Sequence, residues 1–97
     1  MEHLEEPVSG YLVVKSEEMR LNIPERVLSV WLQELQLERI ESGDSFFDLG
    51  GNSLIASRVA DQLSRDLGIE VAIADLFEFD TLGVFTKMII DKVPTDS

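Results

Sequence analysis

The sequence of 97 residues contains no cysteine and only one histidine. Without cysteine the chain cannot form a disulfide framework, a thiolate metal site or a cysteine nucleophile. With His3 as its single histidine, the chain cannot form a zinc site from several histidines, and a Ser-His-Asp triad would have to use His3. The missing residue types therefore exclude several common catalytic and metal-binding chemistries.

Basic residues are also scarce, with 8 Lys and Arg against 19 Asp and Glu, a formal net charge of −11. Phosphate backbones and anionic membrane surfaces repel such a chain, so we expect no nucleic-acid or membrane partner. No run approaches about 18 consecutive apolar residues, and Met1–Pro7 is acidic where a signal peptide is basic. We expect a cytoplasmic protein whose partners carry basic docking patches, although the charge could also serve solubility alone.

Length and composition suit one domain with a single modest core, because 44% of the residues are apolar. Residues 1–21 lack a regular pattern, and we expect a leader or linker, partly disordered, with some docking of Tyr11–Val14. Residues 22–92 are predicted to form the domain, and residues 93–97 a loose tail.

Apolar residues at helical spacing predict two long helices in the first two thirds of the chain. The first covers roughly residues 24–37, with Asn22 as its N-cap and Trp31 in the core. The second starts near Ser53 and runs to about Leu67, where the following glycine can close it.

Two further helices are predicted in the last third of the chain. A short helical turn covers residues 72–77, and a last helix begins at a cap, Asp80 or Thr81, and ends near Asp91. Three main helices and one short one, with little strand signal, predict an all-α fold, a small four-helix bundle.

The segment 38–52 lacks helical periodicity, and so long a loop in a small domain is usually functional or packed by its own side chains. It ends with two glycines, Gly50 and Gly51, which permit a tight backbone and keep side chains away from Ser53. We therefore expect Ser53 to be exposed at a helix start. Free amide groups there would stabilise a phosphate ester on its hydroxyl.

Three known motifs do not fit this loop. A nucleophile elbow needs a second glycine after the serine, a P-loop needs Gly-Lys-Ser/Thr, and a calcium loop counted from Asp44 lacks its ligands. A plainer interpretation stays open on the residues alone, in which the glycines form a turn and Asn52 or Ser53 only caps the helix.

Residues 46–54, FFDLGGNSL, resemble the core motif of phosphopantetheine-binding carrier proteins, most closely the peptidyl carrier (thiolation) domains of nonribosomal peptide synthetases. The resemblance covers about residues 22–92. Outside the motif it rests on Trp31, Asp44 and the segments 38–40, 67–71 and 76–82.

The resemblance implies an acyl carrier protein-like bundle whose Ser53 hydroxyl receives 4′-phosphopantetheine from coenzyme A. A separate, magnesium-dependent phosphopantetheinyl transferase would catalyse this step, since no base stands near Ser53 in the sequence. The domain itself would be non-catalytic, without a metal site and monomeric. It would shuttle thioester-bound aminoacyl, peptidyl or acyl groups between an adenylation or loading enzyme and condensation, thioesterase or other acyl-processing enzymes.

The resemblance also implies which residues serve the cofactor and the partners. Gly51, Asn52 and Leu54 would surround the attachment residue, Ser53. Partner enzymes would contact the start of the second helix and the short helix, at Leu54, Ser57, Arg58, Asp61, Ile73, Leu76 and Phe77.

Asn52 departs from the family pattern, because peptidyl carriers commonly have His or Asp before the serine. The double glycine fits the peptidyl type, so nonribosomal peptide or related secondary-metabolite biosynthesis is the expected pathway. Two alternatives remain at this point: a dedicated acyl carrier of a fatty-acid or polyketide-type pathway, and an unmodified acidic helical interaction domain.

Overall fold

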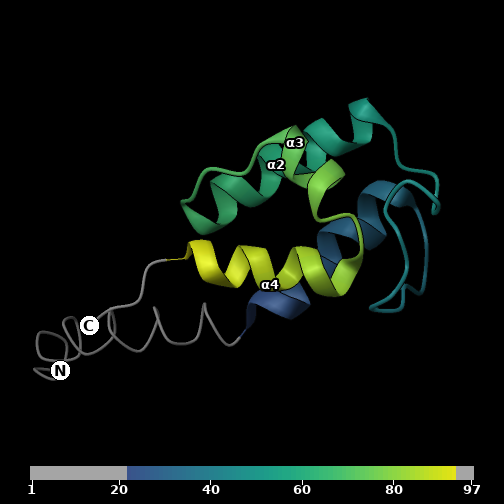
Figure 1. Ribbon diagram of the computed structural model, residues 1–97, viewed down its shortest axis with the longest axis horizontal. Helices are drawn as coiled ribbons and strands as arrows, with labels where there is room; N and C mark the ends of the chain where they lie inside the picture. The colour runs from purple at the N-terminus through teal and green to yellow at the C-terminus, as the bar shows by residue number, and fades with distance from the viewer. Residues whose placement is uncertain (1–21, 94–97) are drawn as a thin grey trace, which may run out of the picture.

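Four segments of the described residues, 22–93, are helical in the computed structural model (Figure 1). They are residues 22–35, α2 (Ser53–Leu67), α3 (Ile73–Glu78) and α4 (Leu82–Lys92). Within these residues the only β pairing is an isolated bridge between Ser45 and Thr81. The predicted all-α class is therefore confirmed, whereas the expected leader, residues 1–21 with Tyr11–Val14, lies outside the described residues. None of the described helices is long and apolar enough to cross a bilayer.

The first helix differs from its prediction at both ends. Asn22 is already helical, so the prediction that it is the N-cap is wrong. The helix stops at residue 35 because Gln36 adopts a left-handed backbone with φ 58°. The next amide, of Leu37, then donates to the Leu32 carbonyl at 2.9 Å, which closes the helix end as a glycine usually would.

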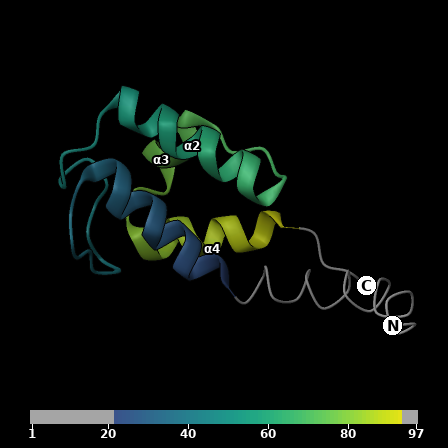
Figure 2. The ribbon, with the colours of Figure 1, turned by 180° about the vertical axis from the view of Figure 1, so that it is seen from behind.

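The helix over residues 22–35 lies against α4, and α2 packs across the two (Figures 1 and 2). The short α3 lies between α2 and α4 in both views. Segment 36–52 forms the long connection at one end of the bundle. This arrangement places the start of α2, where the segment ends, at that same end of the molecule.

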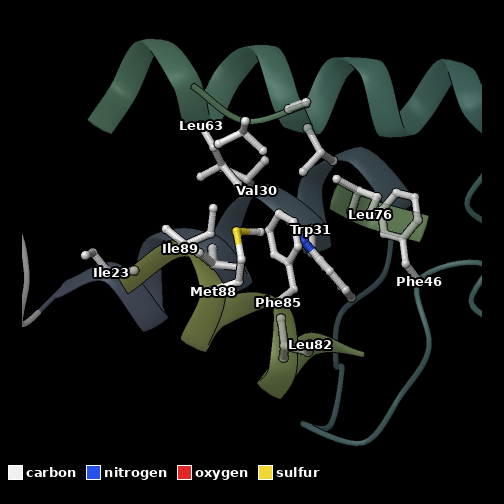
Figure 3. Close-up of a cluster of buried hydrophobic side chains, with 14 of the residues drawn as sticks. Ile23, Val30, Trp31, Phe46, Leu63, Leu76, Leu82, Phe85, Met88 and Ile89 are labelled. Carbon is white, nitrogen blue, oxygen red and sulfur yellow. The ribbon is translucent and has the colours of Figure 1, made fainter. Parts of the chain in front are cut away.

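The core is centred on Trp31, which is fully buried and contacts one ring from the long segment and one from α4 (Figure 3). Its centroid lies 5.0 Å from that of Phe46, edge to face, and 5.5 Å from that of Phe85. Such pairs contribute about 0.5–1.5 kcal/mol beyond the burial of their area. Phe46 therefore holds the long segment to the bundle.

Backbone hydrogen bonds fix the long segment further, because they join it to the junction before α4. The amide-to-carbonyl bonds are Phe46 to Asp80 at 2.7 Å, Leu82 to Asp44 at 3.2 Å and Gly83 to Ser42 at 2.9 Å. Thr81 caps α4, since its Oγ1 accepts from the Val84 amide at 3.4 Å, as predicted. The segment without helical periodicity is thus ordered by its own contacts.

Val93 belongs to the packed bundle rather than to the loose tail predicted for residues 93–97. Its side chain is buried, and its amide donates to the carbonyls of Ile89 and Ile90 at 3.2 and 3.3 Å. Residues 94–97 lie outside the described part of the chain. The packed domain therefore reaches at least one residue beyond the predicted boundary at residue 92.

Candidate functional site

Ser53 is the first residue of α2, and its side chain is exposed to solvent as predicted. Within residues 22–93, no hydrogen bond involves its hydroxyl. No basic side chain is therefore in place to take its proton. The hydroxyl is accessible to another molecule, and any activation of it would need a base from outside the described residues.

Asn52, and not Ser53, caps the helix. Its backbone is extended, with φ −150° and ψ −177°, and its side-chain Oδ1 accepts from the Ile55 amide at 2.9 Å. The amides of Ser53 and Leu54 have no partner among the described residues, and the first turn of α2 carries no acidic side chain. A phosphate ester on Ser53 would therefore meet free donors and the positive end of the helix.

The two glycines of the loop are needed for different physical reasons. Gly50 has φ 106°, a region that side chains with a Cβ rarely adopt, although the space around it is open. Gly51 sits against Phe46: a Cβ there would overlap the ring and lie 2.7 Å from the Phe46 carbonyl oxygen. The Gly51 amide also donates to that oxygen at 3.0 Å. The loop thus packs tightly against the core residue Phe46 just before Ser53, where α2 begins.

Asn52→Ala is expected to lower the free energy of unfolding by about 1 kcal/mol, because the Ile55 amide loses its side-chain partner. Asn52→Asp is the matched control, since it keeps an acceptor oxygen at the helix start and should stay within about 0.5 kcal/mol of wild type. Urea unfolding followed by circular dichroism measures both. An equal loss in the two variants would contradict the assignment of the cap.

Three large apolar side chains are exposed close to this loop or on the neighbouring α3. Leu54 follows Ser53 and is 61% exposed; Ile73 and Phe77 are 40% and 56% exposed and share one face of α3. The Phe77 ring stacks on Phe47 of the motif, with 4.5 Å between centroids and 20° between planes. We call Leu54, Ile73 and Phe77 the apolar docking surface, after the partner role that the resemblance predicts for them.

Leu76 does not belong to this surface, so the prediction that it contacts partners is wrong. Its side chain is completely buried, and it is the one buried residue of α3 (Figure 3). It points toward the core because a six-residue helix needs one side chain to attach it to the bundle. Ile73 and Phe77 are exposed, and the partner role predicted for them stays a prediction.

The other predicted partner residues lie on α2. Ser57 is half-buried, while Arg58 and Asp61 are exposed. The Arg58 guanidinium lies 3.9 Å from the Glu34 carboxylate, and Asp61 pairs with Arg65 at 3.1 Å. Surface pairs of this kind contribute little stability, so both charges remain available to a partner. Their partner role stays a prediction.

Among residues 22–93 no group of three or more His, Cys, Asp or Glu side chains could hold a metal ion.

A sequence model of the family described as "Phosphopantetheine attachment site" matches residues 25–89. The match contains the whole loop, Ser53 and the apolar docking surface. It ends within α4, so it covers about the same part of the chain as the bundle described above.

Relatives and solved structures agree with this match. One of the linear gramicidin synthase proteins of Brevibacillus parabrevis is 35% identical over 85 residues, which is 86% of this chain but 2% of the synthase protein. Malpinin synthetase of Mortierella alpina is 46% identical over 63 residues, 65% of this chain and 1% of the synthetase. The structure of the phosphopantetheine transferase Sfp with coenzyme A and a peptidyl carrier protein contains a chain with a TM-score of 0.68 and 26% identity. That alignment covers 72% of this chain and 91% of the other. The chain thus corresponds to a small part of the relatives and to nearly all of a solved domain.

Proposed function

Because the chain belongs to the phosphopantetheine attachment site family, we propose that it is a peptidyl carrier domain that bears 4′-phosphopantetheine on Ser53. In this role it carries thioester-bound intermediates of nonribosomal peptide biosynthesis and does not itself catalyse a reaction. The single observation that carries the proposal is the exposed Ser53 hydroxyl, free of hydrogen bonds among the described residues, at the start of α2.

The residues around Ser53 fit the phosphate ester of this group. The amides of Ser53 and Leu54, free among residues 22–93, face the same end of the helix, and Gly50 and Gly51 add no side chain beside it. Asn52 keeps the helix start intact through its own bond to Ile55. When attached, the group supplies a terminal thiol on which an acyl or aminoacyl chain is held as a thioester, a thiol that this cysteine-free chain lacks.

The attachment step belongs to a separate phosphopantetheinyl transferase. The Ser53 oxygen forms a new bond to the phosphorus next to the pantetheine arm, and the bond from that phosphorus to the adenosine bisphosphate leaving group breaks. A base of the transferase takes the hydroxyl proton, because no side chain of the described residues bonds Ser53. The chain contributes position and accessibility only.

The apolar docking surface is where we place the transferase and, in turn, an adenylation or loading enzyme and the condensation, thioesterase or other acyl-processing enzymes. Exposed aromatic and aliphatic side chains at one site are typical of protein contacts. The net charge of −11 adds attraction to basic faces and raises the encounter rate. We further propose that the domain acts as a monomer in the cytoplasm.

Intact-mass measurement tests the proposal. The protein is incubated with coenzyme A, magnesium and a transferase of broad specificity, and the expected product is a single phosphopantetheine adduct mapped to Ser53. No adduct under these conditions would overturn the proposal and favour an unmodified interaction domain. Modification followed by loading only from a fatty-acid or polyketide-type enzyme would favour the dedicated acyl carrier instead.

A further inference from the structure

Lys92 joins three parts of the chain at the end of α4. Its ammonium donates to the Glu70 carbonyl at 2.8 Å and to Asp75 Oδ2 at 3.3 Å. The same Asp75 oxygen accepts from the Ala72 amide at 2.9 Å, just before α3. We call these contacts the Lys92 clasp. It holds the link between α2 and α3, and the first turn of α3, to the last turn of α4.

The clasp differs from the other ion pairs of the described residues. The cations of the other four pairs, Arg26–Asp66, Arg39–Glu41, Arg58–Glu34 and Arg65–Asp61, are more than half exposed. Lys92 and Asp75 are 37% and 17% exposed, and Lys92 satisfies a backbone carbonyl as well as the carboxylate. Partial burial and two acceptors make the clasp stronger than a surface pair.

Few other contacts hold α3 in place. With six residues it is too short to be stable as a helix on its own, and Leu76 is its one buried side chain. Ahead of it, Val71 exchanges hydrogen bonds with the Ser64 hydroxyl, at 3.0 and 3.4 Å. The Phe77 ring rests on Phe47 at its other end. Among residues 22–93, Lys92 therefore supplies the one ion pair that ties α3 to another helix.

We propose that Lys92 is a positioning residue for partner docking: its clasp sets the place at which α3 presents Ile73 and Phe77. The inference rests on the proposed function only for the docking partner. The attachment of α3 follows from the contacts alone, and the hydrogen bonds of Lys92 go to Glu70 and Asp75, not to Ser53 or the docking surface. They hold the first turn of α3, the end of the helix at which Ile73 lies.

A double-mutant cycle of Lys92→Met, Asp75→Asn and the double variant tests the clasp. Methionine keeps much of the length of the side chain and removes its charge, and asparagine keeps an oxygen for the Ala72 amide. Amide hydrogen exchange of α3 is expected to speed up by roughly 3- to 10-fold in each single variant and no further in the double one. Lys87→Met is the matched control: it removes an exposed cation of α4 that forms no ion pair among residues 22–93, and its α3 should exchange as in wild type.

The second measurement is the steady-state rate of coenzyme A-dependent labelling by the transferase. Lys92→Met and Asp75→Asn should each raise the KM for the carrier by roughly 3-fold or more and leave kcat near wild type, because Ser53 is untouched. Unchanged exchange in Lys92→Met, or additive effects in the double variant, would overturn the clasp as the anchor of α3. Faster exchange with an unchanged KM would overturn its role in docking. Failure of the proposed function shows separately, as an absence of labelling in wild type, and the exchange data still decide whether Lys92 positions α3.

Discussion

Ser53→Ala is expected to abolish phosphopantetheine labelling completely while leaving the stability of the domain unchanged. The substitution removes the one oxygen to which the phosphate is attached. It removes no hydrogen bond, because the Ser53 hydroxyl makes none among residues 22–93 and Asn52 provides the cap of α2. The free energy of unfolding should stay within about 0.5 kcal/mol of wild type. Intact mass and urea unfolding measure the two quantities on the same sample.

Ser29→Ala is the matched control for this prediction. Ser29 lies in the helix over residues 22–35, outside the predicted partner residues, is exposed and carries the same hydroxyl. This variant should still be labelled fully with phosphopantetheine. The control therefore distinguishes the loss of the Ser53 oxygen from a general effect of replacing a serine. An adduct on Ser53→Ala would mean that another residue is the attachment point, and the proposed function would have to be reassigned to it.

Gly51→Ala is expected to have the largest effect on stability of the alanine substitutions at the loop glycines. The added methyl group would overlap the Phe46 ring, and Phe46 cannot move aside because it is fully buried against Trp31. Overpacking of this kind typically costs about 1–3 kcal/mol. We expect a cost near the upper end of this range, because the added methyl group would meet the Phe46 backbone as well as its ring. Labelling should also slow, since the loop that delivers Ser53 must shift.

Two other glycines serve as controls for Gly51. A Cβ at Gly43 would meet nothing within 4 Å, and its φ is not in the left-handed region, so Gly43→Ala should be neutral. Gly50 also has open space but a φ of 106°, so Gly50→Ala should cost about 1–2 kcal/mol through backbone strain. Urea unfolding ranks the three. If Gly51→Ala is as stable as Gly43→Ala, the close contact with Phe46 is not maintained in solution.

The helices were predictable where local signals mark both ends. α2 begins at Ser53 and ends at Leu67 as predicted, because Asn52 caps it and Gly68, with φ 67°, closes it. The first helix lacked such a mark at its end. Gln36 takes the left-handed position there without being a glycine, so its residue type does not signal the conformation.

The site was predictable at the motif and less so on α3. The prediction of Ser53 needs the loop and the resemblance together, since the residues alone also allow a simple cap. On α3, six residues are too few for apolar spacing to show which face is buried. The sequence therefore does not show that Leu76 is buried and Phe77 exposed. The Lys92 clasp was missed for another reason. Lys92 lies 17 positions from Asp75 and 22 positions from Glu70, and it bonds Glu70 through the backbone carbonyl. No sequence pattern marks such contacts.

The rings of Trp31, Phe46, Phe47 and Phe77 form an unbroken series from the middle of the core to the molecular surface. Trp31 is the only tryptophan of the chain, and it is fully shielded from water. Indole fluorescence shifts to longer wavelength on contact with water, so the domain carries a built-in optical probe at the inner end of this series. The ring next to the probe is the one that Gly51 packs against. The emission wavelength of Trp31 therefore reports, without any added dye, whether the loop that ends at Ser53 is packed against the bundle.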